Sequence, residues 1–234
     1  MTRPPSAVAA DPVLVRLTDP QRTGTRPSPL PLRRPAAIRR TLLLKTAFDY
    51  SLAAVLLILT APLVAFCAVL VRLTSRGPAF YSQQRVGQFG RVFTIYKLRT
   101  MYHQCERLTG PKWSVPGDPR VTPVGRVLRA CHVDELPQLV NVLRGQMSLI
   151  GPRPERPEIA AQLARSIEDY NARSSVLPGI TGHAQVHLPP DTSVADVRDK
   201  VRLDRHYLGR LSFWFDLVTL ARTGLKVAGL YRTR

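Results

Sequence analysis

The hydrophobic pattern of the chain is dominated by one long apolar segment. Residues 51–71 read SLAAVLLILTAPLVAFCAVLV and contain no charged residue. As an α-helix this segment would be about 31 Å long, which is enough to cross the hydrocarbon core of a bilayer. It is apolar all round, so it fits a buried helix of a water-soluble domain less well. Pro62 lies near its middle and predicts a bend, because proline removes a backbone donor and clashes with the preceding turn.

Positive charge flanks the apolar segment on both sides. The basic residues are Arg33, Arg34, Arg39, Arg40 and Lys45 before it, and Arg72, Arg76, Arg85, Arg91, Lys97 and Arg99 after it. Because positive charge marks the cytoplasmic side of a membrane segment, a straight span would carry one basic flank outside. A re-entrant helix broken at Pro62 would keep both flanks on the cytoplasmic side. A conventional kinked span is the alternative that the pattern leaves open.

Shorter patterns after the apolar segment predict a mixed α/β domain. Residues 79–101 hold two β-prone runs around the turn sequence GQFG, which predicts a β-hairpin. On the second strand Phe93 and Ile95 share a face with Lys97 and Arg99. A strand that begins apolar and ends basic is typical of a solvated strand end, or of a sheet edge that opens on an anion site.

The second half of the chain is predicted to be mainly helical. Helical spacing follows Glu135 at Leu136, Leu139, Val140 and Leu143, and Gly145 is a natural stop. MSLI predicts a short strand, and GPRP predicts a rigid turn that presents Arg153. Residues 195–211 predict an amphipathic helix, and residues 212–231 an amphipathic helix at the membrane interface, with core packing as the competing explanation.

These patterns divide the chain into three predicted parts. Residues 1–44 are rich in proline and basic residues and predict a disordered arm, with a transit peptide as the minor alternative. Residues 45–73 are the expected membrane helix. Residues 74–234 are the expected domain on the cytoplasmic face, with the amphipathic helices at its C-terminal end.

The charge balance narrows the class of partner. The chain has 34 Lys and Arg against 16 Asp and Glu, a net charge of +18. Such a balance predicts an anionic partner, either nucleic acid, an anionic membrane surface or a phosphorylated substrate. Cys67, Cys105 and Cys131 are too few for a disulfide framework and lack the spacing of a zinc site, which favours a reducing, cytoplasmic setting.

Asp134 and Glu135 form an adjacent acid pair in this basic chain. One interpretation is structural: Asp134 caps the following helix, and Glu135 favours its positive end. The other is chemical, because carboxylates bind Mg²⁺, which also takes phosphate oxygens, and a carboxylate can attack phosphorus. The cations expected to bind the phosphates are Arg129, Arg153, Lys97 and Arg99. We expect these cations to lower the pKa of both carboxylates, as suits a phosphoryl-transfer site.

Four stretches carry a resemblance to a known family. They are SRGPAFYSQQRVGQFGRVFTIYKLRTM, DPRVTPVGRVLR, VDELPQLVNVLRGQMSLIGPRP and PGITGHAQV, in this order. Together they resemble the bacterial sugar transferase family, the monotopic polyprenyl-phosphate phosphoglycosyl transferases, from about Lys45 to near the C-terminus. The resemblance implies transfer of a sugar phosphate from a nucleotide-diphosphate sugar, usually a UDP-sugar, to a polyprenyl phosphate such as undecaprenyl phosphate.

The same resemblance implies the setting of the reaction. The nucleoside monophosphate, UMP for a UDP-sugar, is released in the first membrane step of polysaccharide or glycoconjugate synthesis. The enzyme sits on the cytoplasmic face of the bacterial inner membrane through a re-entrant helix, whose break maps onto Pro62. The expected partners are the UDP-sugar, polyprenyl phosphate and inner-membrane lipid, without nucleic acid. A homodimer is left open.

The resemblance also implies roles for individual residues. Asp134 matches the nucleophile, which attacks the β-phosphate and forms an aspartyl phosphosugar, and Glu135 matches the residue tied to Mg²⁺. Arg129 matches an arginine linked to the lipid phosphate, and Arg153 matches another arginine that contacts phosphate. The basic stretch YKLRTM supplies the remaining candidates, Lys97 and Arg99.

The chain departs from the family pattern at several positions. Ala61 stands where serine is usual before the proline, and Gln146 stands where the family has aspartate. Leu177 replaces a frequent arginine, His183 replaces a usual tryptophan, and HLPPD at 187–191 replaces an NGR-like stretch. These departures motivate the alternative that the protein is a catalytically degenerate member of the family. A non-enzymatic, basic, membrane-anchored binding protein is the other alternative.

Overall fold

The structure is a computed structural model that describes residues 36–107, 110, 113–115, 117–191 and 193–231. Residues 1–35 of the predicted arm therefore lie outside the described residues. Its last part, residues 36–44, belongs to the helix α1 (Ala36–Thr74), which begins earlier than the sequence pattern predicted. The reason is local: no proline follows Pro35 before Pro62, and leucine, which dominates residues 42–44, is a good helix former.

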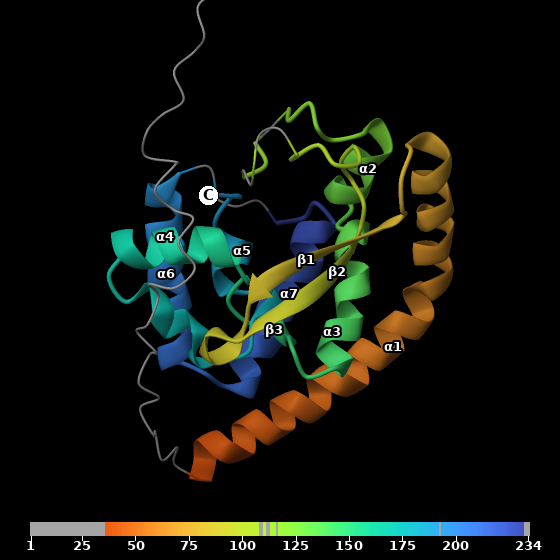
Figure 1. The fold of residues 1–234 in the computed structure, drawn as a ribbon. Coiled ribbons are helices and arrows are strands. Elements are labelled where there is room, and N and C mark those ends of the chain that lie inside the picture. Colours follow the sequence, from red (N-terminus) through yellow and green to blue (C-terminus); the bar gives the residue numbers. More distant parts are fainter. Residues whose placement is uncertain (1–35, 108–109, 111–112, 116, 192, 232–234) are drawn as a thin grey trace, which may run out of the picture. The chain divides into compact units, whose positions relative to one another are not determined.

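Helix α1 continues through Pro62 and bends (Figure 1). Its orange and gold parts run in different directions, as expected for a helix with an internal proline. The Thr60 hydroxyl donates a hydrogen bond to the Leu56 carbonyl at 2.7 Å, a back-bond that also favours bending. Within the described chain, the stretch Leu42–Thr74 is the one helix that is long and apolar enough to cross a membrane.

The predicted β-hairpin is confirmed. Strand β1 (Phe80–Val86) pairs antiparallel with β2 (Val92–Leu98), and Tyr81 lies opposite Lys97. The short 3-10 helix η2 (Gln88–Gly90) makes the turn. A second, separate pair is parallel and joins β3 (Ser148–Ile150) to β4 (Gly179–Thr181). The prediction of a mixed α/β domain is therefore correct, with two small sheets.

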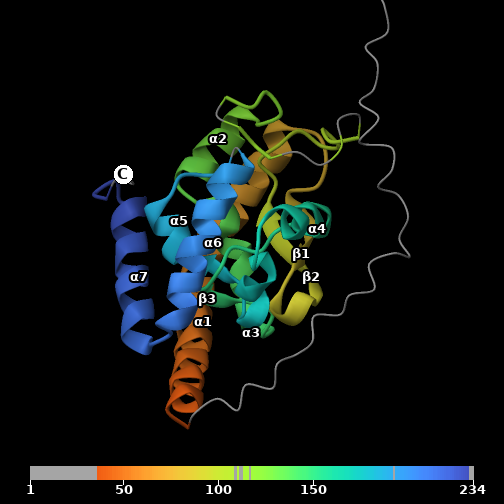
Figure 2. The same ribbon diagram turned by 90° about the vertical axis from the view of Figure 1, so that its left-hand side faces the viewer.

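Helices and 3-10 turns connect and cover these sheets. They are α2 (Pro123–Ala130), η3 (Val133–Gln138), α3 (Leu139–Leu143), α4 (Pro157–Ser166), η4 (Tyr170–Ser175), α5 (His183–His187), α6 (Val194–Gly209) and α7 (Phe213–Val227). Helix α3 ends before Gly145, whose φ of 70° is the left-handed conformation expected at a helix stop. Helix α5 packs against both α6 and α7 (Figure 2). The two amphipathic helices predicted near the C-terminus are thus present as α6 and α7.

Both parts of α1 pack on the domain that follows it. Ala53, in the first part, is fully buried in a cluster with Val142, Ile150 and Tyr207. In the second part, Cys67 and Val71 join a smaller cluster with Leu98 and Leu128. The exposed apolar residues of α1 are Leu43, Leu44, Val55, Ile58, Leu59, Leu63, Phe66, Val69 and Leu73. Leaving a side chain of this kind in water forgoes about 1.5–3 kcal/mol, so this face requires an apolar environment.

Polar contacts hold α1 to the domain near both of its ends. Near the start, Lys45 Nζ pairs with Asp216 of α7 at 2.7 Å and donates to the carbonyl of Ile150 at 3.0 Å. At the other end, the Arg99 guanidinium donates to the carbonyls of Ser75, at 2.8 Å, and of Arg76. The two ends of the apolar helix are therefore anchored to one and the same domain.

Candidate active site

The acid pair lies in the first turn of η3, directly after α2. The residue that caps η3 is His132, whose φ of 56° is left-handed and whose side chain makes no capping hydrogen bond. The structural interpretation, in which Asp134 caps the helix, is therefore wrong, because His132 takes the capping position of η3 two residues earlier. Val133 and Leu136 pack into two different hydrophobic clusters and fix the η3 turn on both sides of the acids.

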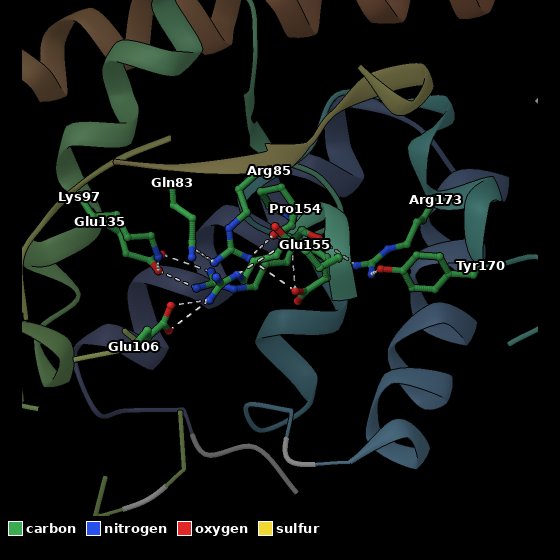
Figure 3. A network of polar contacts seen from close by, with 12 residues as sticks. Gln83, Arg85, Lys97, Glu106, Glu135, Pro154, Glu155, Tyr170 and Arg173 are labelled. Carbon is green, nitrogen blue, oxygen red and sulfur yellow. Dashed lines mark hydrogen bonds and ion pairs between the residues drawn. The ribbon is translucent and has the colours of Figure 1, made fainter. Parts of the chain in front are cut away.

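Glu135 is paired with two cations that the sequence had singled out. Its Oε1 accepts hydrogen bonds from Lys97 Nζ and from Arg153 Nη2, both at 2.7 Å, and Arg153 Nη1 lies 3.4 Å from Oε2. Figure 3 shows Lys97 and Glu135 side by side in the network of polar contacts. Lys97 comes from the end of β2, and Arg153 from the turn after β3. Burial raises the pKa of Glu135, but Arg153 and Lys97 outweigh it and hold that pKa well below its usual value.

Asp134 differs sharply from its neighbour. Only 7 % of the residue is exposed, and its carboxylate makes no hydrogen bond with any residue that the structure describes. Burial first, and the charge of Glu135 second, raise the pKa of Asp134 against the opposing effect of Lys97, Arg129 and Arg153. The expectation of a lowered pKa is thus confirmed for Glu135 and wrong for Asp134, because burial and the charge of Glu135 outweigh the cations there.

Arg129 stands one helical turn before the acid pair, at the end of α2. Its Nε donates to the Thr100 hydroxyl at 2.8 Å and its Nη1 to the Ser114 hydroxyl at 2.7 Å. It also lines a pocket of about 350 Å³. The other lining residues are Tyr102, Val115, Gly117, Asp118, Pro119, Val121, Pro123 and Arg126. The pocket offers two arginines and apolar walls, a combination that suits an anionic ligand with an apolar part.

Arg99 is the one predicted site residue that the structure places elsewhere. Its guanidinium caps the end of α1 through the carbonyls of Ser75 and Arg76, and Ser75 Oγ lies 3.0 Å from Nη2. A side chain at Gly77, whose φ is 112°, would collide with this guanidinium. Of the predicted set, Lys97, Arg153 and Glu135 are brought into contact. A phosphate-binding role for Arg99 stays a prediction that its described contacts do not favour.

The turn that carries Arg153 is held by its backbone carbonyls. Arg173 Nη2 donates to the carbonyl of Arg153 at 3.1 Å, and Arg85 Nη1 donates to that of Pro154 at 3.0 Å (Figure 3). The carbonyl of Pro152 accepts a hydrogen bond from the Gly179 amide at 2.9 Å. Neither Arg85 nor Arg173 is among the site residues predicted from the sequence. Arg85 stands in a stretch that carries the family resemblance, but nothing in the sequence indicates that Arg173 reaches this turn.

The buried cations that hold this turn are themselves neutralised. Arg173 pairs with Asp204 of α6 at 2.8 Å, and Arg85 approaches Glu155 at 3.5 Å. Both arginines are buried or nearly so, and a buried charge is tolerated only when it is paired and hydrogen-bonded. The turn therefore rests on a framework of paired charges, which leaves the guanidinium of Arg153 aimed at Glu135.

Gln146, at the position of the missing family aspartate, has a structural contact. Its side-chain carbonyl accepts a hydrogen bond from Asn141 Nδ2 at 2.8 Å. Asn141 is fully buried and also bonds the Thr94 carbonyl and the Tyr96 amide of β2. The described contact of Gln146 thus supports the junction of α3 with β2 and does not involve the acid pair. An aspartate or a glutamine could supply the accepting oxygen.

The other departures lie in the packing of the C-terminal helices. The ring of His183 lies 4.3 Å from that of His187 and 5.0 Å from that of Phe215, measured between centroids. Within the segment 187–191, Asp191 pairs with Lys200 of α6 at 2.8 Å. Leu177 contributes its carbonyl to the tight approach around Gly151, where no side chain would fit.

The donor set allows only a limited metal site. Among the described residues, no group of three or more His, Cys, Asp or Glu side chains could hold a metal ion. Mg²⁺, however, is commonly bound through one or two carboxylates together with substrate phosphates. Asp134 and Glu135 therefore fit a Mg²⁺ ion that is shared with a bound diphosphate, and do not fit a site made by the protein alone.

Comparisons with known proteins agree on one family. An undecaprenyl-phosphate glucose phosphotransferase of Komagataeibacter xylinus is 42% identical over 178 residues, which are 74% of this chain and 34% of the relative. A UDP-N-acetylgalactosamine-undecaprenyl-phosphate N-acetylgalactosaminephosphotransferase of Aeromonas hydrophila is 42% identical over 180 residues, 77% of this chain and 42% of the relative. This chain therefore spans less than half the length of these two relatives.

A shorter relative gives the same picture. A UDP-glucose:undecaprenyl-phosphate glucose-1-phosphate transferase of Caulobacter vibrioides is 44% identical over 183 residues, which are 76% of this chain and 67% of the relative. The sequence model described as "Bacterial sugar transferase" matches residues 40–229. The matched range contains most of α1, the acid pair and the Arg153 turn, so the chain belongs to the bacterial sugar transferase family.

Proposed function

We propose that this protein transfers a sugar phosphate from a UDP-sugar to a polyprenyl phosphate such as undecaprenyl phosphate, and releases UMP. The observation that carries the proposal is the asymmetry of the acid pair. The Asp134 carboxylate is buried and makes no hydrogen bond with a described residue, whereas Glu135 is held by Lys97 and Arg153. One acid is thus available to react, and the other organises positive charge beside it. The names of the relatives support the same substrates.

In the first step, a carboxylate oxygen of Asp134 attacks the β-phosphorus of the UDP-sugar. The new bond joins Asp134 to the sugar phosphate, and the bond from the β-phosphorus to the bridging oxygen breaks, so that UMP leaves with both electrons of that bond. The raised pKa of Asp134 makes its ionised form a more basic nucleophile than an ordinary aspartate. Absence of a hydrogen bond to a described residue means that none has to be broken before the attack.

In the second step, a phosphate oxygen of the polyprenyl phosphate attacks the phosphorus of the aspartyl phosphosugar. The bond between Asp134 and phosphorus breaks, and the carboxylate is regenerated. The product is a polyprenyl diphosphate sugar. Arg129, which lines the 350 Å³ pocket, would hold one of the phosphates involved.

The cations around Glu135 are opposite in charge to the diphosphate of the substrate. Lys97 and Arg153 stand beside the nucleophile, where a diphosphate brings negative charge, and both already lie in a largely buried site. Glu135, with diphosphate oxygens, would hold a Mg²⁺ ion. When bound, that ion supplies charge neutralisation for the diphosphate and its leaving group.

We further propose that α1 is re-entrant, with the active site on the cytoplasmic face of the inner membrane. A straight span would put the ends of the apolar segment on opposite sides of a hydrocarbon core about 30 Å thick. A domain on one side could not then hold both ends, yet Lys45 pairs with Asp216 and Arg99 caps Ser75 in this chain. The basic flanks favour the same topology.

Helix α7 has features of a helix that lies at the interface between this membrane and water. Trp214, near its start, is 72 % exposed, and Phe213 packs edge-on against Phe48 of α1 with ring centroids 5.4 Å apart. Exposed tryptophan is typical of the interface between lipid and water. The contact with α1 places this end of α7 beside the apolar helix, so both helices meet lipid together.

A turnover assay tests the proposed function directly. The full chain in nanodiscs would receive undecaprenyl phosphate, Mg²⁺ and each member of a panel of UDP-sugars, and UMP release would be measured. We expect at least one donor to release UMP above the level of an Asp134→Asn variant. If no donor does so, the proposal fails, and a degenerate or non-enzymatic role takes its place.

A further inference from the structure

One contact between the membrane helix and the frame of the active site is made to a backbone carbonyl. Lys45 Nζ of α1 donates to the carbonyl of Ile150 at 3.0 Å, and the Tyr207 hydroxyl approaches the same oxygen at 3.3 Å. Ile150 is the last residue of β3, and the turn that carries Arg153 begins directly after it. A side chain on the apolar helix therefore holds the base of the turn that presents Arg153 to Glu135.

Lys45 is itself part of a buried polar cluster that joins three helices to β3. It pairs with Asp216 of α7 at 2.7 Å and with Asp49, one turn along α1, at 3.5 Å. The Tyr207 hydroxyl of α6 donates to Asp216 at 2.8 Å, and the Ser148 hydroxyl donates to Asp49 at 2.6 Å. The side chains of Lys45 and Asp216 are only 12% and 6% exposed. Such a cluster defines one seating of α1 against β3, because any shift would leave buried charges unpaired.

The turn between Ile150 and Arg153 has little conformational freedom, so a displacement at one end should move the other end. Pro152 and Pro154 have fixed φ angles, and a residue that precedes a proline is itself restricted. Gly151 could absorb a displacement, but its amide bonds the Thr181 carbonyl at 2.9 Å and no side chain would fit beside it. A shift of the Ile150 carbonyl therefore moves Arg153 instead of being lost in the turn.

We propose that Lys45, together with Asp216, is a positioning residue for Arg153, so that the seating of the membrane helix sets the geometry of the phosphate-binding cations. This inference rests on the proposed function for its catalytic consequence. Lys45 does not touch the acid pair; it acts through the Ile150 carbonyl and the Arg153 turn. The other anchor of α1, Arg99, caps the helix end without touching that turn, so the two anchors have different consequences.

The test removes both charges of the Lys45–Asp216 pair, while Asp49 keeps its hydrogen bond from the Ser148 hydroxyl. The variant is Lys45→Met with Asp216→Asn, and the matched control is Lys200→Met with Asp191→Asn. The control pair is also buried, at 8% and 12% exposure, and has the same residue types at 2.8 Å. Both double variants are made in the full chain and assayed in nanodiscs. Each double variant is also combined with Arg153→Ala to complete a double-mutant cycle.

We expect the Lys45/Asp216 variant to lose kcat/KM by on the order of 10²-fold, since a displacement of about 1 Å has that effect. In the Arg153→Ala background the same change should cost almost nothing further, because its effect passes through Arg153. Tyr207→Phe removes the hydroxyl contacts with Asp216 and the Ile150 carbonyl but keeps the ion pair, so it should give a smaller loss of the same kind. Equal losses in both backgrounds would mean that the pair only stabilises the fold, and would overturn the proposal.

A second readout does not depend on turnover. Hydrogen exchange of the segment 148–156, followed by mass spectrometry, should be faster in the Lys45/Asp216 variant than in the wild type and unchanged in the control. Tyr207→Phe keeps this test decisive if the double variant does not fold. Unchanged exchange in a folded variant would refute the positioning role. Absence of UMP release by the wild type would refute the proposed function alone.

Discussion

Asp134 and Glu135 are adjacent in the chain, yet only Glu135 has cations as hydrogen-bond partners. Lys97 and Arg153 both lie 2.7 Å from the Glu135 carboxylate, while the Asp134 carboxylate makes no hydrogen bond with a described residue. The pKa of Glu135 is lowered and that of Asp134 is raised. Environments that separate the pKa values of two neighbouring acids also separate their chemical roles.

The first prediction concerns the stability of this pair. Glu135→Gln leaves the cations of Lys97 and Arg153 without their counter-charge, so we expect the free energy of unfolding to fall by about 3 kcal/mol. The figure is at the low end for a buried pair because the Arg153 side chain is 36% exposed. Urea unfolding in detergent measures it.

The control for this prediction is Asp199→Asn, which breaks the exposed pair of Asp199 with Arg202 at 3.8 Å. It should change the free energy of unfolding by less than about 1 kcal/mol. Equal effects of the two variants would show that the contacts of Glu135 contribute no more than a surface ion pair.

The second prediction separates two roles for Arg99. Because its guanidinium caps the end of α1, Arg99→Met should destabilise the fold by about 2 kcal/mol, the usual value of a charged hydrogen bond. The KM for the donor should stay that of the wild type. A raised KM with unchanged stability would instead restore the phosphate-binding role predicted from the sequence.

The third prediction concerns membrane topology. Single cysteines at Thr46 and Thr74, both exposed near the two ends of the apolar segment, would be introduced after Cys67, Cys105 and Cys131 are replaced. In intact cells a membrane-impermeant maleimide should label neither position, and both should react once the membrane is opened. External labelling of either one would contradict the re-entrant helix.

The fourth prediction is a pH dependence of stability. Burial, with the nearby His187, His206 and Arg222, lowers the pKa of His183 from 6.5 to about 4. Between these two pH values the unfolded chain binds more protons at this position than the folded chain, so His183 makes stability fall as the pH falls. Above pH 6.5 it has no effect.

Urea unfolding at a series of pH values measures this slope. His183→Phe should flatten the decline between pH 6.5 and 4, because the phenyl ring keeps the stacking and does not titrate. His103→Gln, which removes an exposed histidine elsewhere in the chain, is the control variant. A slope that survives in His183→Phe would assign the proton uptake to other groups.

The sequence predicts the features of this fold that depend on residues close together in the chain better than those that depend on distant residues. The hairpin 80–98 and the helix 194–209 follow from local periodicity, and the structure contains both. The sequence predicts cations around the acid pair, but it does not predict that Arg153 pairs with Glu135. The wrong assignment of Asp134 as a helix cap has a local cause, because a left-handed His132 leaves no signal in the sequence.

Long-range contacts are the part that the sequence could not predict. Arg99 follows the basic strand end, and only the folded chain shows that it turns towards α1 instead of towards the acids. In the same way, nothing local indicates that Lys45 meets Ile150 or that Arg173 meets Arg153, since these pairs are far apart in sequence. Charge balance of buried groups decides such contacts, and it becomes visible only when the fold brings the partners together.

The most direct test of the central claim is mass spectrometry of the full chain after incubation with a turned-over UDP-sugar and Mg²⁺, without polyprenyl phosphate. The account predicts a sugar phosphate attached to the peptide that contains Asp134, absent in Asp134→Asn and discharged when undecaprenyl phosphate is added. Turnover without any such adduct, or undiminished turnover by Asp134→Asn, would contradict it.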